Sequence, residues 1–288
     1  MSTVDATLPA RPSGPAAAAR AWAFVRRHVL TVYSLLFFAY LLLPIGVVVV
    51  FSFNNPPGQF NYTWHSFTWN NWRYWNGVPG IQSAIELSLE IALIASLIAT
   101  ALGTMIALAL VRYRFRGRAG TNILVFLPLS TPEIVLGASL LTLFLNSNLI
   151  GFTIQFGFWT ILIAHVMFCI SFAVVTVKAR LIGFDRHLEE AAMDLGANEW
   201  ATFVKVTLPL IAPAILAALL LCFAISIDDF VVTYFNAGSD VTFPIFVWGA
   251  ARIGAPPQVN VIGTAIFAIA VTFMLVNVFL QDRRAKAA

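Results

Sequence analysis

Five acidic residues lie inside long apolar stretches of this chain, where an ionised carboxylate is costly. They are Glu86, Glu90, Glu133, Asp228 and Asp229. A carboxylate at the centre of a membrane span costs about 2.5–3.5 kcal/mol, so it usually faces a cavity or a partner. No Lys or Arg lies within the same stretches to neutralise these groups. Uncompensated carboxylates favour a cationic solute, and the candidate pathway residues are Glu133, Asp228, Asp229 and Glu90. For each of them, a hydrogen bond that holds two helices together is the structural alternative.

Two of these acids, Asp228 and Asp229, are adjacent, which limits how both can act. Consecutive residues of an α-helix are about 100° apart around its axis. The two acids therefore cannot both face one pathway unless the helix is broken there. In an unbroken helix, one of them would bond to backbone or to a neighbouring helix.

The composition is that of a polytopic membrane protein. The chain has 288 residues, of which 60% are hydrophobic and 10% are charged, whereas a typical soluble domain carries about 25% charged residues. Cys169 and Cys222 fall inside apolar runs and are expected to pack there, with neither a disulfide nor a metal site. No cleavable signal peptide is expected, because the first apolar run starts near Val29 and is longer than the hydrophobic region of a signal sequence.

The hydropathy pattern predicts an all-α membrane protein with six transmembrane helices. The expected spans are about Val29–Phe53, Gln82–Val111, Gly120–Leu145, Gly157–Val177, Leu210–Phe235 and Asn260–Leu280. Residues 29–281 would form this membrane domain, between a flexible N-terminal tail of residues 1–28 and a C-terminal tail of residues 282–288. The first 21 residues are rich in Ala, Pro, Ser and Gly, a composition that cannot bury a core.

Positive charge sets the expected orientation. All Lys and Arg residues except Arg73 and Arg252 lie in the N-terminal tail, between residues 112 and 118, in the stretch 178–209 or at the C-terminal end. Positively charged segments stay on the cytoplasmic side of a membrane. Both termini and the loop 178–209, between the fourth and fifth spans, are therefore predicted to be cytoplasmic. Four arginines between two spans are a stop signal in the bilayer, and no nucleic-acid partner is expected.

Three further features are interpreted as structural. Small residues recur every four positions in the second span and predict close helix packing there: Ala95, Ala99, Gly103 and Ala107. His165 in the fourth span is expected to be a hydrogen-bonded packing residue rather than a ligand. The outer loop from Asn54 to Ile81 is rich in Trp and Tyr, which favours a membrane-interface belt over a ligand-stacking site. Docking of an external partner on this loop is the alternative.

The loop 178–209 carries a motif with fixed spacing. Glu190-Ala191-Ala192 is followed by Gly196, and then, after nine residues, by Val206-Thr207-Leu208-Pro209. The pattern predicts a helix from about Asp185 to Leu195 with Gly196 at its C′ position, and a second helix from Glu199 that ends where Pro209 begins the next apolar run. The segment resembles the EAA loop of ABC-type import permeases, with Val206 in place of Ile as the single departure.

The resemblance implies that this loop is a coupling helix region, which docks in a groove on a cytoplasmic ATPase dimer. The matching positions are Glu190, Ala191, Ala192, Asp194, Leu195, Gly196, Leu208 and Pro209. Glu189, Glu190 and Asp194 would share roughly one helical face. The chain contains no Gly-x-x-x-x-Gly-Lys-Ser/Thr phosphate loop, so ATP and Mg would bind to the partner ATPase and no cofactor to this chain. A plain solvated helical hairpin is the alternative.

Two more segments carry a closer resemblance. Thr131-Pro132-Glu133-Ile134-Val135-Leu136-Gly137 and Ser226-Ile227-Asp228-Asp229-Phe230 look like segments of the second permease subunit of spermidine/putrescine importers, and the likeness covers nearly the whole chain after residue 30. It implies a multi-pass protein of the bacterial cytoplasmic (inner) membrane, a second permease subunit and an extracytoplasmic solute-binding protein. Relatives with similar segments import other solutes, so an ABC permease for another small solute is the first alternative.

A second alternative is a proton-coupled secondary transporter that uses Asp228, Asp229 or Glu133 as proton sites. Such proteins often show paired repeats, and no clear repeat is present. That class and a simple channel both leave the EAA-like loop unexplained. An enzyme is not expected, because no nucleophile–base pair or metal cluster stands out.

Overall fold

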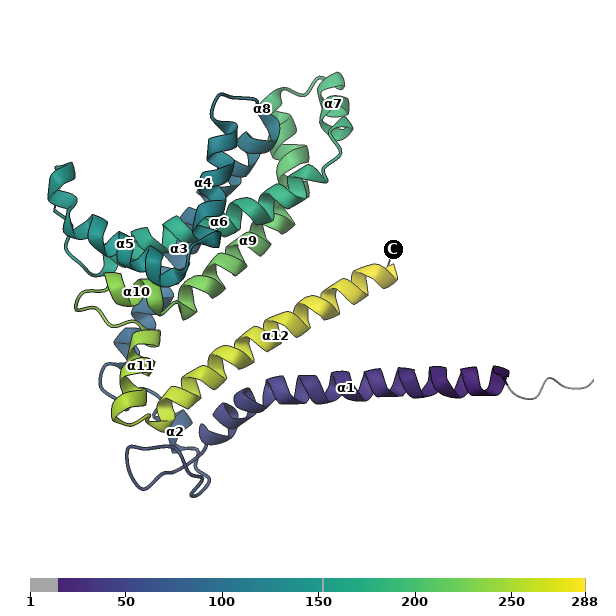
Figure 1. Cartoon of the computed structure of the whole chain (residues 1–288). Coiled ribbons are helices and arrows are strands. Elements are labelled where there is room, and N and C mark those ends of the chain that lie inside the picture. Colours follow the sequence, from purple (N-terminus) through teal and green to yellow (C-terminus); the bar gives the residue numbers. More distant parts are fainter. Residues whose placement is uncertain (1–14, 152, 288) are drawn as a thin grey trace, which may run out of the picture. The chain divides into compact units, whose positions relative to one another are not determined.

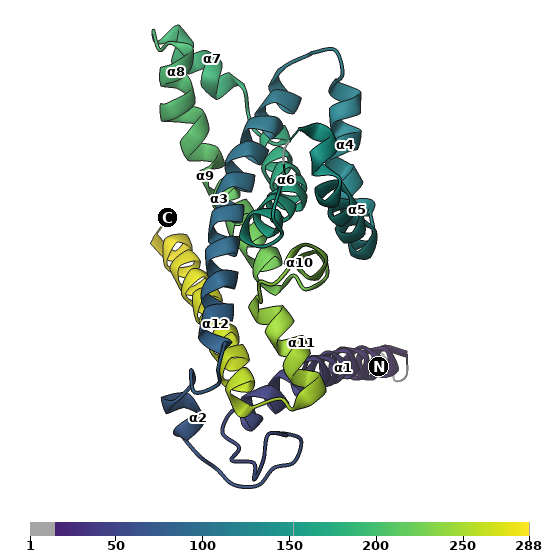
Figure 2. The ribbon, with the colours of Figure 1, turned by 90° about the vertical axis from the view of Figure 1, so that its left-hand side faces the viewer.

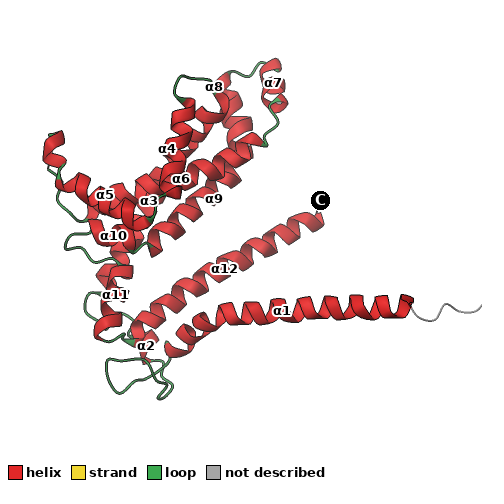
Figure 3. Cartoon of the chain, viewed as in Figure 1, coloured by secondary structure: helices red, strands yellow, loops and turns green. Residues whose placement is uncertain are grey.

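The computed structural model describes residues 15–151 and 153–287, and this part of the chain is helical (Figures 1 and 3). The long helices are α1 (Pro15–Phe51), α3 (Ile81–Arg112), α6 (Phe158–Ile182), α9 (Leu208–Asp228) and α12 (Pro257–Ala287). The shorter elements are α2 (Asn70–Arg73), α4 (Arg118–Ser130), α5 (Glu133–Leu145), the 3₁₀ turn η1 (Ser147–Ile150), α7 (His187–Asp194), α8 (Glu199–Thr202), the π-helical turn η2 (Phe203–Thr207), α10 (Val231–Asn236) and α11 (Phe243–Ile253).

The chain divides into two compact units. The first consists of Met1–Trp75 with Pro256–Ala288, and the second of Asn76–Ala255. In the first unit, α1 and α2 pack against α12. The loop after α1 is held by buried asparagines, since Asn54 Nδ2 donates to Asn61 Oδ1 at 2.7 Å and Asn71 Nδ2 donates to the Asn54 carbonyl at 2.7 Å. This outer loop is thus an ordered structure whose aromatic rings stay largely exposed.

The N-terminal helix starts earlier than expected. Of the predicted tail, residues 1–14 lie outside the described residues, whereas residues 15–28 are helical and continue into the first span without a break. Ala has the highest helix propensity, and this stretch contains Ala16–Ala19 next to a helix that is already formed. Pro44 lies inside α1, which continues through it.

The second unit is built around α3, α6 and α9, which pack against one another (Figure 2). The predicted small-residue seam of α3 is confirmed, since Ala95, Ala99, Gly103 and Ala107 are all buried. A Cβ atom on Gly103 would lie 2.5 Å from Cβ of Ala173 on α6, so only glycine permits this approach. This close packing fixes the positions of α3, α6 and α9 relative to one another. The loop 183–207 connects α6 to α9, so its two ends are held by the same packing.

The predicted third span, about Gly120–Leu145, is a bent pair of helices rather than one continuous helix. The helix stops at Ser130 and resumes at Glu133, and α4 and α5 are bent by 111° at this break. Pro132 disfavours helical backbone at the residue before it, and Thr131 accordingly adopts extended angles of φ −87° and ψ 132°. Glu133 therefore starts a new helix instead of lying in the middle of one.

The fifth predicted span differs at both ends. At its outer end, the break between the two acids that the sequence left open is present: α9 stops at Asp228, Asp229 is extended, and α10 begins at Val231. At its inner end, the helix does not stop at Pro209, because a single helical segment runs from Glu199 to Asp228. The π-helical turn η2 widens the helix just before Pro209, where the proline ring would otherwise meet a backbone carbonyl.

Among the described residues, four helices are long and apolar enough to cross a membrane, or five if the bent α4–α5 pair counts as one span. They include α1, α3, α6 and the segment that ends with α9. Between the fifth and sixth predicted spans lies a helix that the sequence did not lead us to expect, α11, which has Pro244 in its first turn. The protein is thus a mostly helical membrane protein, as predicted.

Candidate functional site

A cavity of about 360 Å³ lies where the two helix breaks meet in the second unit. It brings together three of the four predicted pathway acids, Glu133, Asp228 and Asp229. The other lining residues are apolar apart from Thr131: Pro128, Leu129, Leu136, Phe168, Phe172, Ile225, Phe230, Val231 and Val232. Because none of the lining residues is Lys or Arg, the cavity combines carboxylates with aromatic walls and carries no positive charge of its own.

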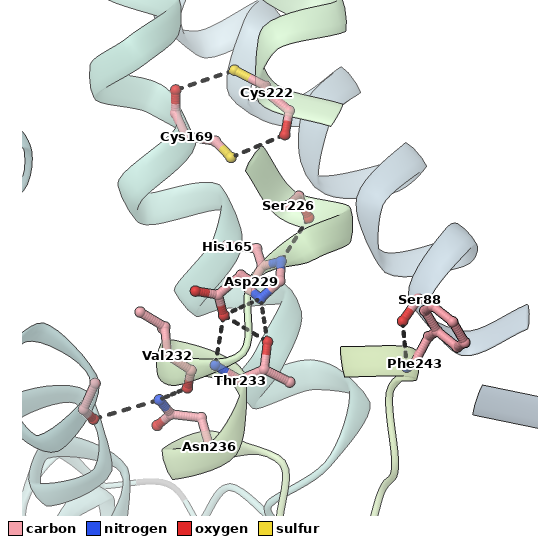
Figure 4. A network of polar contacts seen from close by, with 11 residues as sticks. Ser88, His165, Cys169, Cys222, Ser226, Asp229, Val232, Thr233, Asn236 and Phe243 are labelled. Carbon is pink, nitrogen blue, oxygen red and sulfur yellow. Dashed lines mark hydrogen bonds and ion pairs between the residues drawn. The ribbon is translucent and has the colours of Figure 1, made fainter. Parts of the chain in front are cut away.

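Asp228 and Asp229 have different surroundings because the helix ends between them. The Asp229 side chain is only 7% exposed, and its Oδ2 atom accepts hydrogen bonds from the Thr233 backbone N–H at 2.8 Å and the Thr233 hydroxyl at 2.7 Å (Figure 4). Asp228 is exposed. The helix break that would let the two acids face different surroundings is therefore present, and Asp229 is held by hydrogen bonds to Thr233.

His165 on α6 completes the polar network behind the cavity. Its Nδ1 atom lies 2.6 Å from the Ser226 hydroxyl, and its Nε2 atom lies 2.8 Å from the Thr233 hydroxyl and 3.4 Å from Asp229 (Figure 4). The Thr233 hydroxyl has one hydrogen, which it donates to Asp229, so it must accept from a protonated Nε2. The prediction that His165 is a buried, hydrogen-bonded packing residue is confirmed.

The remaining acids lie at helix surfaces. Glu133 is exposed in the first turn of α5, where the positive end of the helix dipole favours a carboxylate. Glu90 is exposed on α3 and is not among the residues that line the cavity. Four residues earlier, Glu86 accepts a hydrogen bond from Gln82 at 2.8 Å. The structure thus separates Glu90 from the other three candidates.

The loop between α6 and α9 forms a second candidate site. The α7 helix ends in two hydrogen bonds around Gly196: its N–H donates to the Met193 carbonyl at 2.9 Å, and the Ala197 N–H donates to the Ala192 carbonyl at 3.0 Å. Gly196 has φ +90°, which confirms it as the C′ glycine. A Cβ atom there would meet nothing within 4 Å, so the need for glycine is conformational.

Glu189 has a role that the sequence reasoning missed. Both of its carboxylate oxygens accept from the Arg112 guanidinium, and Oε1 also accepts from the Thr207 hydroxyl. Burial raises the pKa of Glu189, but the Arg112 and Thr207 hydrogen bonds and the charges of Arg112 and Arg186 outweigh it and hold that pKa below the ordinary glutamate value. The expectation that Glu189 shares a face with Glu190 and Asp194 is wrong, because Glu189 is 6% exposed and the other two are exposed.

A signal for this ion pair was present in the sequence. Neighbouring residues of a helix point about 100° apart, so Glu189 and Glu190 could not both face outward in the same direction. Arg112 lies at the end of α3, on the same predicted side of the membrane. The pairing itself joins residues that are 77 positions apart, a distance that no local pattern spans.

The outer face of this loop is exposed and partly apolar. Leu195 is 90% exposed, Trp200 is 73% exposed, and Glu190, Ala191 and Asp194 are exposed as well. Glu190 pairs with His187 of its own helix, with Oε2 3.2 Å from Nδ1. Of the other candidate coupling residues, Ala192 is half-buried, while Leu208 and Pro209 lie within the continuous helix.

The described part of the chain offers no other evident chemistry. It contains no group of three or more His, Cys, Asp or Glu residues placed to hold a metal ion. Cys169 and Cys222 are buried free thiols, each of which donates to the backbone carbonyl of the other, at 3.6 and 3.3 Å (Figure 4). Their packing role agrees with the prediction.

Comparison with known proteins places these features in a family. Residues 99–284 match the family described as binding-protein-dependent transport system inner membrane component. The chain is 36% identical over 250 residues to the spermidine/putrescine transport system permease protein PotC of Escherichia coli K12. The aligned residues cover 86% of this chain and 92% of that protein. It is 37% identical over 243 residues to the putrescine transport system permease protein PotI of the same organism, over 82% of this chain and 84% of that protein.

Solved structures agree in fold. A chain of a bacterial ABC transporter involved in the import of the polysaccharide alginate matches with a TM-score of 0.66 and 15% identity, over 92% of this chain and 99% of that chain. A chain from the alginate transporter in complex with its pentasaccharide-bound periplasmic protein gives a TM-score of 0.61 and 17% identity, over 89% and 94% of the two chains. The chain therefore belongs to the family of inner membrane components of binding-protein-dependent transport systems, and it is a permease subunit of an ABC importer.

Proposed function

We propose that this permease subunit imports polyamines such as putrescine and spermidine across the bacterial cytoplasmic membrane. The observation that carries the proposal is the cavity at the two helix breaks, which holds the exposed carboxylates of Glu133 and Asp228 and is lined by no Lys or Arg. The names of PotC and PotI, which are spermidine/putrescine and putrescine permeases, support the same solute class.

The chemistry of the cavity fits a cation with an alkyl backbone. Aliphatic amines resemble the lysine side chain, whose pKa is about 10.4, so they are protonated at neutral pH. Carboxylates bind ammonium groups through charge-assisted hydrogen bonds, and aromatic faces attract cations and cover methylene groups. Glu133 and Asp228 would bind the ammonium groups, and Phe168, Phe172 and Phe230 would contact the carbon chain. Asp229 would position the first turn of α10 through Thr233.

The proposed topology has six spans with both termini in the cytoplasm. The spans are α1, α3, the bent α4–α5 pair, α6, the segment that ends with α9, and α12. They belong to the membrane domain of residues 29–281, and residues 1–28 and 282–288 lie in the cytoplasm. The distribution of Lys and Arg supports this orientation, and it places the loop 178–209 between the fourth and fifth spans on the cytoplasmic side.

The same loop would connect the chain to its energy source. Its exposed residues on and after α7, from Glu190 to Gly196, would dock on a cytoplasmic ABC ATPase dimer that binds ATP and Mg, while this chain binds no cofactor. Closure of the ATPases on ATP would pull the docked helices together and shift the spans between inward-open and outward-open states. A second permease subunit would form the other half of the pathway, and an extracytoplasmic solute-binding protein would deliver the solute.

Uptake of labelled putrescine and spermidine tests this function. We expect cells that lack the gene to lose uptake and the intact gene to restore it. Gly196→Trp should not restore it, because the ring would project from the docking face, and the variant should no longer copurify with the ATPase. The matched control is Gly117→Trp, since Gly117 also has a positive φ (+94°) and open space around it but lies between α3 and α4.

Three outcomes would count against parts of the proposal. Undiminished polyamine uptake in deletion cells without a redundant system would overturn the solute and point to another small molecule. Normal ATP-dependent uptake by Gly196→Trp would remove the docking role of this loop. Uptake that persists without any ATPase subunit would favour the proton-coupled alternative.

A further inference from the structure

We infer that Arg112, Glu189 and Thr207 form a mechanical joint, here called the clasp, that passes the motion of α7 to α3 and α9. The inference rests on the proposed docking of α7 on an ATPase. It assigns a positioning role to three residues that would contact neither the solute nor the ATPase. Arg112 is the last residue of α3, Glu189 lies in the first turn of α7, and Thr207 ends the π-helical turn that leads into α9.

The hydrogen bonds of the clasp fix the orientation of α7 relative to α3 and α9. Arg112 donates from Nη1 to Glu189 Oε2 at 2.6 Å and from Nη2 to Oε1, and the Thr207 hydroxyl donates to Oε1 as well. A planar guanidinium that binds both oxygens of a carboxylate fixes the orientation as well as the distance of the two groups. The three residues line a cavity of about 910 Å³, and within it Glu189 is only 6% exposed. Movement of α7 must therefore move both helices or break the clasp.

The clasp also binds the α9 segment at a place where this segment can bend. The turn η2 has π-helical bonding, and Pro209, two residues after Thr207, has no backbone N–H to donate. A helix bends most easily at such a place. With Thr207 bonded to Glu189, the bend in this segment would follow the position of α7.

Of the two helices reached by the clasp, α9 leads directly to the cavity, and α3 packs against α9 and α6. Both α3 and α9 pack against α6, and α9 ends at Asp228 in the cavity wall. A displacement applied to the exposed face of α7 would thus arrive at the helix break through packed helices. Glu190 is less suited to this purpose, because its side chain is exposed and pairs with His187 of the same helix.

The experiment uses the assembled transporter in liposomes and records ATP hydrolysis and labelled spermidine uptake together. For Glu189→Gln and Arg112→Gln we expect the ATPase to remain bound and active, with uptake per ATP about tenfold lower. The charge swap Arg112→Glu with Glu189→Arg should restore at least half of the ratio. Thr207→Val should lower it about threefold and Thr207→Ser should not. Glu199→Gln, an exposed carboxylate on α8, is the control with no change.

A second readout needs no transported solute. Spin labels on the exposed residues His187→Cys of α7 and Met105→Cys of α3 report the distance between these helices with and without ATP. In the otherwise unchanged protein we expect the same narrow distance in both states, and with Glu189→Gln a distribution that broadens or shifts on ATP binding.

The outcomes separate the two proposals. Failure of the parent complex to transport spermidine would refute the proposed solute, and the spin-label distances would still decide whether the clasp exists. An unchanged uptake per ATP in Glu189→Gln, or an α7–α3 distance that changes with ATP equally with and without Glu189, would overturn the clasp. A variant that loses uptake and bound ATPase in the same proportion would do so as well, because it would indicate a role in assembly alone.

Discussion

Two regions of the molecule each contain a pair of adjacent acids, and in each pair the chain binds one acid and exposes the other. In the loop, Glu189 is buried against Arg112 and Glu190 is exposed. At the cavity, Asp229 is buried against Thr233 and His165, and Asp228 is exposed. In the loop, helical geometry explains the separation, since adjacent side chains of α7 diverge by about 100°. At the cavity, the helix ends between the two acids. An acidic doublet in such a protein therefore indicates one structural and one accessible carboxylate.

The two pairs differ in what holds the buried member. Glu189 meets a permanent positive charge, so its ion pair joins distant helices and is insensitive to pH near neutrality. Asp229 is bonded to a hydroxyl, a backbone amide and an imidazole that belong to the adjoining helices. The exposed members differ too, because Glu190 has His187 beside it, whereas Asp228 lies in a cavity that no Lys or Arg lines. From this contrast we expect the loop pair to transmit helix movement and the cavity pair to contact the solute.

The largest expected effect on stability is at the buried acid of the cavity. Asp229→Ala should lower the free energy of unfolding by about 2 kcal/mol, because Thr233 loses the acceptor for two of its donors. Asp228→Ala should change it by less than about 0.5 kcal/mol. Unfolding of both variants in detergent micelles measures the difference. Equal losses for the two would mean that the pair is not divided into a structural and an accessible acid.

A smaller effect, with a defined pH dependence, is expected at the loop. Glu189→Gln should lower the free energy of unfolding by about 1–2 kcal/mol at neutral pH, since Arg112 is partly exposed and the ion pair is partly screened. The pKa of Glu189 is lowered in the folded protein, so this contribution is complete above the ordinary glutamate pKa of about 4.3 and is lost as the pH falls through the lower folded-state value.

The measurement for this prediction is the difference in unfolding free energy between the unaltered chain and Glu189→Gln across pH. We expect a constant difference from pH 8 to pH 6 and a shrinking one below about pH 4. A difference that instead vanished near pH 6 would indicate that Glu189 is not held by Arg112.

The smallest expected effect concerns the turn after α7. Gly196→Ala should cost about 1 kcal/mol of local stability, because φ is +90°, a conformation that a residue with a Cβ atom resists. No steric clash should add to this cost, because a Cβ atom there has open space around it. Hydrogen exchange should quicken at the Ala197 amide, which bonds to the Ala192 carbonyl. Unchanged exchange there would show that the turn does not depend on glycine, and Gly46→Ala, which also has open space but no positive φ, provides the control.

Local patterns in the sequence predicted the features that depend on local geometry. The small residues of α3, the C′ position of Gly196 and the buried His165 follow from spacing, from backbone conformation and from the cost of burying a polar ring. The resemblance of Thr131–Gly137 and Ser226–Phe230 to polyamine permeases indicated the segments that line the cavity.

The features that sequence reasoning missed depend on contacts between distant segments. The break at Pro132 had a local signal, but the break at Asp229 has neither Gly nor Pro and is stabilised by Thr233 and His165 instead. The bond between Arg112 and Glu189 joins two elements 77 residues apart. Pro209 was interpreted as a helix end because a π-helical turn that accommodates it leaves no signal in composition.

The central claim is that the exposed acids of the cavity contact a transported cation. Its most direct test is the initial rate of labelled spermidine uptake, measured against concentration in liposomes that contain the assembled transporter, for Asp228→Asn, Glu133→Gln and the control Glu86→Gln. We expect the concentration for half-maximal uptake to rise about tenfold for each cavity variant, because each loses a charge-assisted contact, and to stay the same for Glu86→Gln. Identical curves for all three variants and the unaltered chain would contradict the account.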